Sequence, residues 1–328
     1  MNVRFNTVCT LIAAAFVGCA APNAGRPAPG GIPLASNFAA PRARDVRLFV
    51  SDYEAGAILV YSLPSLSLIK TISLVNQLPK GECSDNHGDV WVTNDVPQNA
   101  PRLTNEFNHD GVLINTLSDP FGFPGQGCAW DPTTGDLAVT NINFSCCSSN
   151  VLIYPGASGT PRQLGGEGIK FSYFLGYDSQ GDLFFDGEDL NYQFTLSELP
   201  KGGQSAHDID VSGGKIVFPG MVQSTDSATL YVGDIDCKHR QLSCLHRLSL
   251  NGSSAKITEE VDLHDSGGFP LCNMMQGVIW TGHFYGSSLQ TCDTNSNATY
   301  IWRFPAGGKP QKGSSPQELQ PYGAAISL

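Results

Sequence analysis

An all-β fold, a six-bladed β-propeller of four-stranded blades closed by the C-terminal strand, is predicted by two features of this 328-residue sequence. A five-residue strand signature returns six times at steps of 42 to 48 residues, and an incomplete blade stands at each end of the repeat region. A period in the forties built from short β-rich runs is the length of one blade. The six signatures are Leu48–Asp52, Val90–Asn94, Leu137–Asn141, Leu183–Gly187, Leu230–Asp234 and Val278–Gly282.

The residues around each signature predict the other strands of a blade. Upstream runs such as Pro79–Asp85 and Pro124–Asp131 contain a Pro or Gly and end in an Asp that a glycine follows, which is typical of a hairpin turn. We expect these runs to be inner strands and each signature to be the second strand of its blade. Downstream runs such as Ile58–Leu63 and Val151–Tyr154 are rich in β-branched and aromatic residues and predict third strands.

The two ends of the repeat region predict how the ring closes. Only residues 42–46 precede the first signature, whereas Pro321–Leu328 resembles an inner strand that lacks a blade of its own. We therefore expect the C-terminal strand to complete the first blade, which pairs two open edges. Residues 46–328 then form one domain, and 36 Gly, 21 Pro and only 15% charged residues suit such a turn-rich β protein.

The N-terminal segment is typical of an export signal. Arg4 and the apolar run Leu11–Gly18 lead to Cys19, and this run is too short to span a membrane. The sequence Phe16-Val-Gly-Cys19 resembles the bacterial lipobox, whose Cys carries a lipid, with Phe16 where that motif usually has Leu. We expect residues 1–19 to be a signal peptide and residues 20–45 to be a flexible Pro-, Gly- and Ala-rich tether. Ordinary cleavage near Ala20 or Ala21 is the alternative.

These features predict a bacterial protein in the cell envelope or outside the cell. The net charge of -11 argues against binding to nucleic acid or to an anionic membrane surface, so the only expected membrane contact is a lipid anchor. A domain of this size buries roughly three-quarters of its unfolded surface, and we expect it to fold as a monomer.

Eight cysteines remain after the signal peptide, an even number that predicts disulfides in an exported chain. They are Cys83, Cys128, Cys146, Cys147, Cys237, Cys244, Cys272 and Cys292. Metal binding by these thiols is the alternative, although no Cys-x-x-Cys pair is present.

The propeller topology narrows the pairing of these cysteines. We expect Cys237 to pair with Cys244 across a short loop, and Cys272 to pair with Cys292 inside the sixth blade. By analogy with the pair in the sixth blade, Cys128 is expected to pair with Cys146 or Cys147 inside the third blade. Cys83 is then expected to pair with whichever of Cys146 and Cys147 remains.

Long connections are expected on one face of the ring, where second strands lead to third strands and one blade leads to the next. Residues 95–102, 142–150, 235–243 and 283–299 are longer than a hairpin needs, and three of these segments contain cysteines. Long loops on a rigid scaffold commonly form a binding surface. A function limited to bracing the fold against unfolding and proteolysis is the alternative.

Two sets of polar residues are candidate binding sites. Asn94, Asn141 and Asp234, like Asp52 and Asp186, close second strands on this face, and His283 follows the sixth signature. Oxygen ligands from several blades would suit calcium or another divalent cation, whereas the alternative is that each side chain bonds the backbone of its own turn. Glu82, Gln126 and Asn273 lie near the starts of inner strands and are expected to face the central channel.

One further pair of acidic residues lies in the segment His207–Asp210. Asp208 and Asp210 alternate along a predicted strand and would share one face, where they could meet a cation. A solvated outer strand is the alternative. Motifs for serine hydrolases, zinc proteases, phosphate loops and covalent haem are absent from the sequence.

The repeat pattern at residues 48–61 and 124–154 resembles that of NHL-type and related six-bladed propellers. Gluconolactonase-like enzymes among these relatives hold a divalent metal in the channel with Glu, Asn and Asp side chains. In this sequence Tyr322–Ala325 lacks the acidic residue expected in the first blade, and Glu82 of another blade is its only substitute. The sequence thus favours a non-enzymatic binding or scaffold module that holds a protein, peptide or glycan on its disulfide-braced loop face. The alternative is a metal-dependent hydrolase or lactonase with a divalent ion in the central channel.

Overall fold

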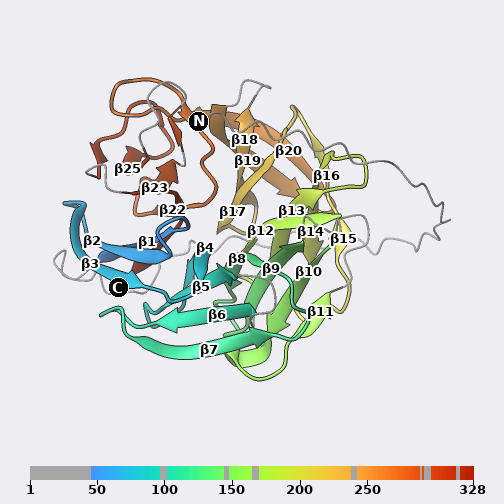
Figure 1. Ribbon diagram of the computed structural model, residues 1–328. Helices are drawn as coiled ribbons and strands as arrows, with labels where there is room; N and C mark the ends of the chain where they lie inside the picture. The colour runs from blue at the N-terminus through green and yellow to red at the C-terminus, as the bar shows by residue number, and fades with distance from the viewer. Residues whose placement is uncertain are drawn as a thin grey trace. The chain divides into compact units, whose positions relative to one another are not determined.

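The computed structural model describes residues 46–96, 102–143, 148–164, 170–237, 242–288, 290–291, 297–314 and 318–328. These residues form six main β-sheets arranged around a common centre, which confirms the predicted six-bladed β-propeller (Figure 1). The described part of the chain contains one short 3-10 helix, η1 (Pro155–Ala157), and has no helix of the length and apolarity that a membrane span requires.

Each blade is an antiparallel sheet whose strands follow one another from the centre of the ring outward. In this order, blade 1 consists of β27 (Pro321–Ser327), β1 (Arg47–Asp52), β2 (Ala57–Ser62) and β3 (Ser67–Ser73). Blade 2 consists of β4 (Leu78–Ser84), β5 (Val90–Asp95), β6 (Arg102–Phe107) and β7 (Leu113–Asp119). Blade 3 consists of β8 (Gly125–Trp130), β9 (Leu137–Asn143), β10 (Ser148–Tyr154) and β11 (Arg162–Leu164).

The remaining blades depart from this plan in small ways. Blade 4 consists of β12 (Phe171–Tyr177), β13 (Leu183–Glu188), β14 (Phe194–Leu199) and β15 (His207–Asp208). Blade 5 consists of β17 (Pro219–Asp226), β18 (Thr229–Cys237), β19 (Leu242–Asn251) and β20 (Ser254–Asp262), with β16 (Asp210–Ser212) added parallel to β20. Blade 6 consists of β22 (Gly277–Trp280), β23 (His283–Ser288), β25 (Ala298–Arg303) and β26 (Lys312–Gly313), beside a short pair of β21 (Leu271–Cys272) and β24 (Gln290–Thr291).

The C-terminal strand closes the ring, as the sequence predicts. Strand β27 pairs antiparallel with β1 from Arg47 opposite Ser327 to Asp52 opposite Pro321. All seven residues of β27 are buried. The strand also contacts β4 and β22, the inner strands of blades 2 and 6.

The sixth signature does not have the expected position. The sequence predicts Val278–Gly282 as a second strand, but its first three residues lie in β22, the inner strand of blade 6. The second strand is β23, which pairs with β22 on one side and β25 on the other. Thr281 and Gly282 have positive φ values and form the turn between the two. The prediction is wrong because an apolar run before a Thr-Gly turn fits an inner strand as well as a second strand.

Glycines let the inner strands of neighbouring blades approach one another closely. A Cβ atom on Gly323 of β27 would lie 2.5 Å from the Lys80 carbonyl oxygen of β4. In the same way, a Cβ on Gly81 would lie 2.5 Å from the Gln126 carbonyl oxygen of β8. Contacts this short are not tolerated by real Cβ atoms, so the tight centre of the ring depends on these glycines.

The apolar residues of the signatures form the core between blades. In β1, Leu48, Phe49 and Val50 are all fully buried although they point alternately to opposite faces of their sheet. Each blade is covered by a neighbour on both faces, so its second strand is apolar on both sides.

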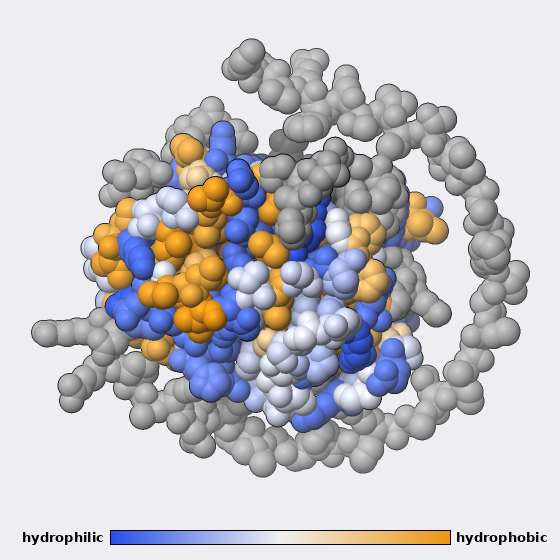
Figure 2. All heavy atoms as spheres, turned by 60° about the horizontal axis from the view of Figure 1, so that its bottom comes forward, coloured by the Kyte–Doolittle hydropathy of each residue, from blue (hydrophilic) through white to orange (hydrophobic). Residues whose placement is uncertain are grey.

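The outer strands carry a different kind of surface. Figure 2 shows apolar side chains gathered on one side of the face that comes forward, beside a largely polar area. Among the exposed large apolar residues are Leu68 and Ile69 of β3 and Leu113 and Ile114 of β7. Strand β3 is tied to the turn before β7, since Lys70 Nζ donates hydrogen bonds to the carbonyl oxygens of Asp110 at 2.7 Å and Gly111 at 3.0 Å.

Candidate functional site

A cavity of about 850 Å³ opens at the centre of the ring, and the inner strands of all six blades line it. The lining includes the C-terminal parts of β27, β4, β8 and β12, the middle of β17 and all of β22. The cavity therefore lies on the side where first strands turn into second strands, at residues such as 85–89 and 178–182. We call this side the hairpin face and the opposite side, which carries the connections from second to third strands, the loop face. The inner-strand segments in the lining are Ala324–Ile326, Glu82–Ser84, Cys128–Trp130, Leu175–Tyr177, Val222–Gln223 and Gly277–Trp280.

Several aromatic side chains line this cavity. Trp130, Tyr177 and Trp280 each stand at or near the last position of an inner strand, and Tyr285 of β23 packs beside Trp280 with ring centroids 6.2 Å apart. Trp130 Nε1 is buried and has no hydrogen-bond partner. Apolar walls with a few polar groups are typical of sites that bind ligands.

Glu82 is the buried acidic group in this lining. Its side chain is 2% exposed, and neither carboxyl oxygen has a hydrogen-bond partner of normal geometry. Burial raises the pKa of Glu82 well above its usual range, which the nearby backbone N–H of Ala325 offsets only in part. Burial therefore favours the neutral acid, which has both a donor and an acceptor to offer.

Glutamines and a lysine fill the centre of the ring between the two faces. The Gln126 side-chain amide donates a hydrogen bond to the Tyr322 hydroxyl, and its oxygen lies 3.4 Å from Lys80 Nζ. Lys80 also forms an ion pair with Asp95 at 3.4 Å, and its Nζ lies 5.5 Å from the centre of the Tyr53 ring. Burial lowers the pKa of Lys80, and the charge of Asp95 offsets this in part. The lysine is thus a paired structural group.

The acidic residues that close second strands bind backbone groups of their own blade. Asp234 accepts hydrogen bonds from the N–H groups of Val217 at 2.9 Å and Phe218 at 3.1 Å, just before the inner strand β17. Asp52 likewise accepts hydrogen bonds from residues 319 and 320, just before β27. These carboxylates fix the start of an inner strand at the loop face.

The asparagines predicted beside them are also used within their blades. The Asn94 amide donates hydrogen bonds to the carbonyl oxygens of Val92 at 3.1 Å and Leu103 at 3.2 Å. The Asn141 amide donates to Asn150 Oδ1 at 2.9 Å. These hydrogen bonds within single blades favour a structural role for the two asparagines over a cation site shared between blades.

The other predicted site residues lie in three places. Glu82 and His283 line the cavity, but His283 reaches it from the hairpin face because Val278–Gly282 is not a second strand. Gln126 lies at the centre of the ring, and Asn273 lies half-buried between β21 and β22 with a φ of 54°.

Sequence reasoning missed Trp130, Tyr177 and Trp280. All three immediately precede a hairpin turn, at Asp131, Asp178 and Thr281, and this repetition is a signal that the sequence does contain.

The disulfides differ in part from the predicted pairing. Cys237 is bonded to Cys244, as expected. Cys83 is bonded to Cys128, with Cα atoms 5.6 Å apart, so the prediction that Cys128 pairs with Cys146 or Cys147 is wrong. The reason is that the inner strands β4 and β8 are direct neighbours across the glycine contact. Cys272 is also disulfide-bonded, whereas its expected partner Cys292, like Cys146, Cys147 and Cys19, lies outside the described residues.

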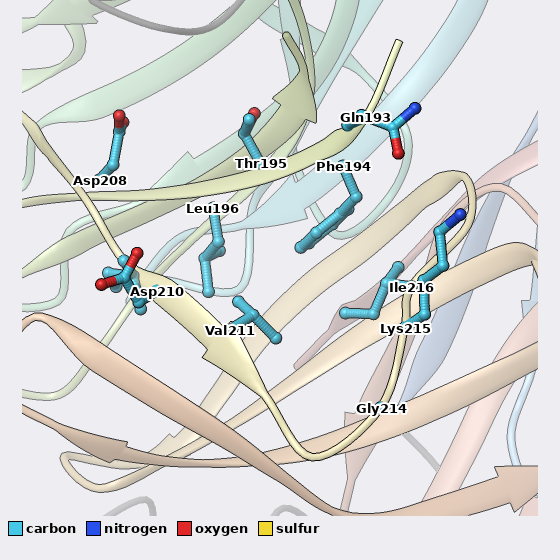
Figure 3. Close-up of a pocket in the computed structure, with 11 residues that line it drawn as sticks. Gln193, Phe194, Thr195, Leu196, Asp208, Asp210, Val211, Gly214, Lys215 and Ile216 are labelled. Atoms are coloured by element: carbon cyan, nitrogen blue, oxygen red, sulfur yellow. The ribbon is translucent and has the colours of Figure 1, made fainter. Parts of the chain in front are cut away.

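A second cavity of about 370 Å³ lies beside β14, where the chain passes from blade 4 to blade 5. Figure 3 shows Phe194, Leu196, Val211 and Ile216 pointing toward one another from two facing segments. Asp208 belongs to β15 and Asp210 to β16, so the chain changes sheets between them and they do not alternate on one strand. Asp208 instead accepts a hydrogen bond from the Ser197 hydroxyl at 2.9 Å.

Comparison with known proteins agrees on the fold. The sequence matches no protein-family model and no curated protein. Among solved structures, the chain is similar to one from a nidogen–laminin complex, with a TM-score of 0.60 and 12% identity over 86% of this chain and 98% of that one.

Two bacterial structures are similar to the same extent. A protein of unknown function from Bacteroides caccae has a TM-score of 0.62 and 13% identity over 86% of this chain and 98% of its own. TolB from Acinetobacter baumannii has a TM-score of 0.58 and 9% identity over 86% of this chain and 66% of its own. At these identities the likeness concerns the propeller fold alone.

Proposed function

We propose that this propeller is a non-enzymatic binding module that holds an extended peptide segment of a protein partner in the cavity of the hairpin face. The observation that carries the proposal is the cavity itself, which all six blades line with aromatic and aliphatic side chains. A volume of about 850 Å³ has room for more than one side chain, and aromatic anchors are typical of the centres of protein interfaces.

The chemistry of the lining indicates what such a peptide offers. Its main anchor is apolar and packs against Trp280 and Trp130, and a polar tip reaches Glu82. The net charge of -11 favours a segment without strong negative charge. A similar propeller has been solved in a complex of nidogen with laminin, so a protein partner is in keeping with this fold.

A peptide selection tests the proposal directly. Random peptides displayed on phage are selected on the purified protein, and the binding of synthetic copies is measured by calorimetry. Trp280→Ala should weaken binding at least about tenfold, or about 1.4 kcal/mol, because it removes a wall of the cavity. Phe121→Ala is the matched control, since Phe121 is an exposed aromatic residue (45%) outside the cavity and its loss should change nothing.

Two results would contradict the proposal. One is a set of selected peptides that bind Trp280→Ala as tightly as the wild type while circular dichroism shows an intact fold. The other is the selection of no peptide at all.

Export and anchoring belong to the same proposal. A lipid on Cys19 and a tether of residues 20–45 would hold the propeller, residues 46–328, near a membrane surface, and its disulfides suit an oxidising compartment. Mass spectrometry of the mature N-terminal peptide tests this step. A diacylglyceryl group on Cys19 that Cys19→Ala abolishes is expected, and an unmodified N-terminus near Ala20 would contradict it.

A metal-dependent hydrolase of the gluconolactonase-like type remains the less favoured function. Such a reaction needs several oxygen ligands around one ion. Among the described residues, two groups of three or more His, Cys, Asp or Glu side chains have ligand atoms within 4.8 Å of one another. Glu82 belongs to neither group.

A further inference from the structure

Four buried side chains of blade 5 bring potential metal ligands together, away from the central cavity. Asp234 and Cys237 lie on β18, and Cys244 and His246 lie on the neighbouring strand β19. One ligand atom from each of them lies within 4.8 Å of those from all the others. The antiparallel register creates this cluster, because it sets Asp234 directly opposite Cys244. All four residues are at most 3% exposed.

The distances from His246 Nε2 to the carboxylate and to one of the two sulfurs already suit a tetrahedral zinc ion. His246 Nε2 lies 3.4 Å from Asp234 Oδ2 and 3.5 Å from Cys244 Sγ. Zinc bonds of about 2.0 Å to nitrogen or oxygen and about 2.3 Å to sulfur place tetrahedral N and O ligands about 3.3 Å apart, and N and S ligands about 3.5 Å apart. The imidazole, the carboxylate and one sulfur thus need little movement to hold the ion.

The surroundings hold two of these ligands in place. Asp234 is fixed by the N–H groups of Val217 and Phe218, so its carboxylate is oriented before any ion arrives. Such support of a ligand by neighbouring hydrogen bonds raises metal affinity. His246 Nδ1 is buried without a hydrogen-bond partner, and the other ring nitrogen, Nε2, points toward Asp234 and Cys244. The burial of this ring therefore lacks a full structural explanation.

We propose that Cys237, Cys244, His246 and Asp234 form a zinc site when the Cys237–Cys244 disulfide is reduced. A small dithiol breaks the S–S bond by giving it two electrons and two protons, and the dithiol leaves as its own cyclic disulfide. The two new thiols release their protons to solvent as Zn²⁺ binds both sulfurs, His246 Nε2 and one Asp234 oxygen. The oxidised pair offers no thiolate, so zinc and the disulfide exclude each other.

The ligand set selects the metal. Thiolate and imidazole ligands favour zinc over calcium or magnesium, which take oxygen ligands. This site is independent of the proposed peptide-binding cavity, whose lining contains none of these four residues.

Cobalt titration tests the proposal, because Co²⁺ occupies tetrahedral zinc sites and gains strong absorption from bound thiolates. The purified protein is reduced with dithiothreitol without oxygen, freed of reductant by gel filtration, and titrated. One equivalent of Co²⁺ should bind with thiolate-to-cobalt absorption that Zn²⁺ then displaces, whereas the unreduced protein should show none. His246→Gln should weaken binding at least about tenfold. His207→Gln, in blade 4, is the matched control and should bind as the wild type does.

A second variant is needed because reduction also opens the other disulfides. Cys237→His removes this disulfide alone, leaves Cys244 as a thiolate ligand and supplies a second imidazole. It should bind one Co²⁺ without any reductant and show the weaker absorption of a single thiolate. The proposal is overturned if neither the reduced wild type nor Cys237→His shows thiolate-to-cobalt absorption, or if the unreduced protein shows it equally.

Discussion

Gln276, the residue just before β22, is hydrogen-bonded to the main chain of Glu82 of β4, although 194 residues separate the two. The side-chain oxygen of Gln276 accepts the Glu82 N–H at 2.8 Å, and its amide donates to the Glu82 carbonyl oxygen at 3.0 Å. Gln276 leads into the inner strand of blade 6 and Glu82 belongs to blade 2, and the closing strand β27 of blade 1 contacts the inner strands of both. The glutamine therefore ties the two ends of the repeat array together at the centre of the ring.

Gln276→Ala should lower the free energy of unfolding by about 3 kcal/mol, because it leaves a buried N–H and a buried C=O without partners. Urea unfolding followed by fluorescence measures the change. Gln223→Ala is the matched control, since Gln223 makes the same pair of bonds to Ile279, at 2.9 and 2.7 Å, from a half-buried position. Its loss should cost less, and equal effects of the two substitutions would contradict the special role of Gln276.

Glu82→Gln should stabilise the protein at high pH. Burial raises the pKa of Glu82 in the folded state, so the folded protein holds this proton more tightly than the unfolded chain does. The resulting stabilisation is complete below the unfolded pKa of about 4.3 and is lost as the pH rises toward the folded value. Glutamine resembles the neutral acid at every pH and avoids this loss.

Melting curves from pH 4 to pH 8 measure this effect. The gain in melting temperature of Glu82→Gln over the wild type should grow across this range. Glu54→Gln, which alters an exposed glutamate between β1 and β2, is the control and should show no such trend. A gain that stays constant with pH would mean that Glu82 does not titrate between the folded and unfolded states as described.

The number of blades and the closure of the ring could be predicted because they follow from local patterns that repeat. The second strands of blades 1 to 5 are buried on both faces, so each one carries a similar apolar run that an Asp or Asn follows. Blade 6 differs because its second strand, β23, begins with His283 and has only two apolar residues, Phe284 and Tyr285, before Gly286, whereas the inner strand β22 matches the signature.

The site could be predicted less well because it depends on contacts between blades. Cys83 and Cys128 meet only through the close approach of β4 and β8, and no spacing within one blade contains that information. Glu82 lies in the lining of the central cavity, but the sequence does not say which face of the ring is hollow. The aromatic residues that precede the hairpin turns were overlooked for that reason.

Gly176→Ala should lower the free energy of unfolding by about 2 kcal/mol, the usual effect of forcing an extra methyl into a packed region. A Cβ on Gly176 of β12 would lie 2.6 Å from the Val222 carbonyl oxygen of β17, and neither strand can move without disturbing its own blade. Gly214→Ala is the control, because its Cβ would meet only the Ile257 side chain, at 3.2 Å. Equal urea midpoints for both variants would contradict the close contact between inner strands.

The disulfide between blades 2 and 3 should stabilise the protein more than the one within blade 5. A bridge restricts the unfolded chain in proportion to the logarithm of the loop that it closes. Cys83 and Cys128 are 45 residues apart, whereas Cys237 and Cys244 are 7 apart, which corresponds to about 4 and about 2 kcal/mol. Replacing both cysteines of each pair by alanine avoids free thiols and allows urea unfolding of the two variants to be compared.

The two decreases in the free energy of unfolding are compared, because one bridge joins two blades and the other closes a short loop within one blade. Cys128 is also packed against Trp91, with its sulfur 3.5 Å from the Trp91 carbonyl oxygen, so Cys83→Ala with Cys128→Ala also removes some packing and widens the expected gap. A larger loss for Cys237→Ala with Cys244→Ala would contradict the loop-closure argument. It would also indicate that the buried Asp234 and His246 depend on that disulfide for their place in the fold.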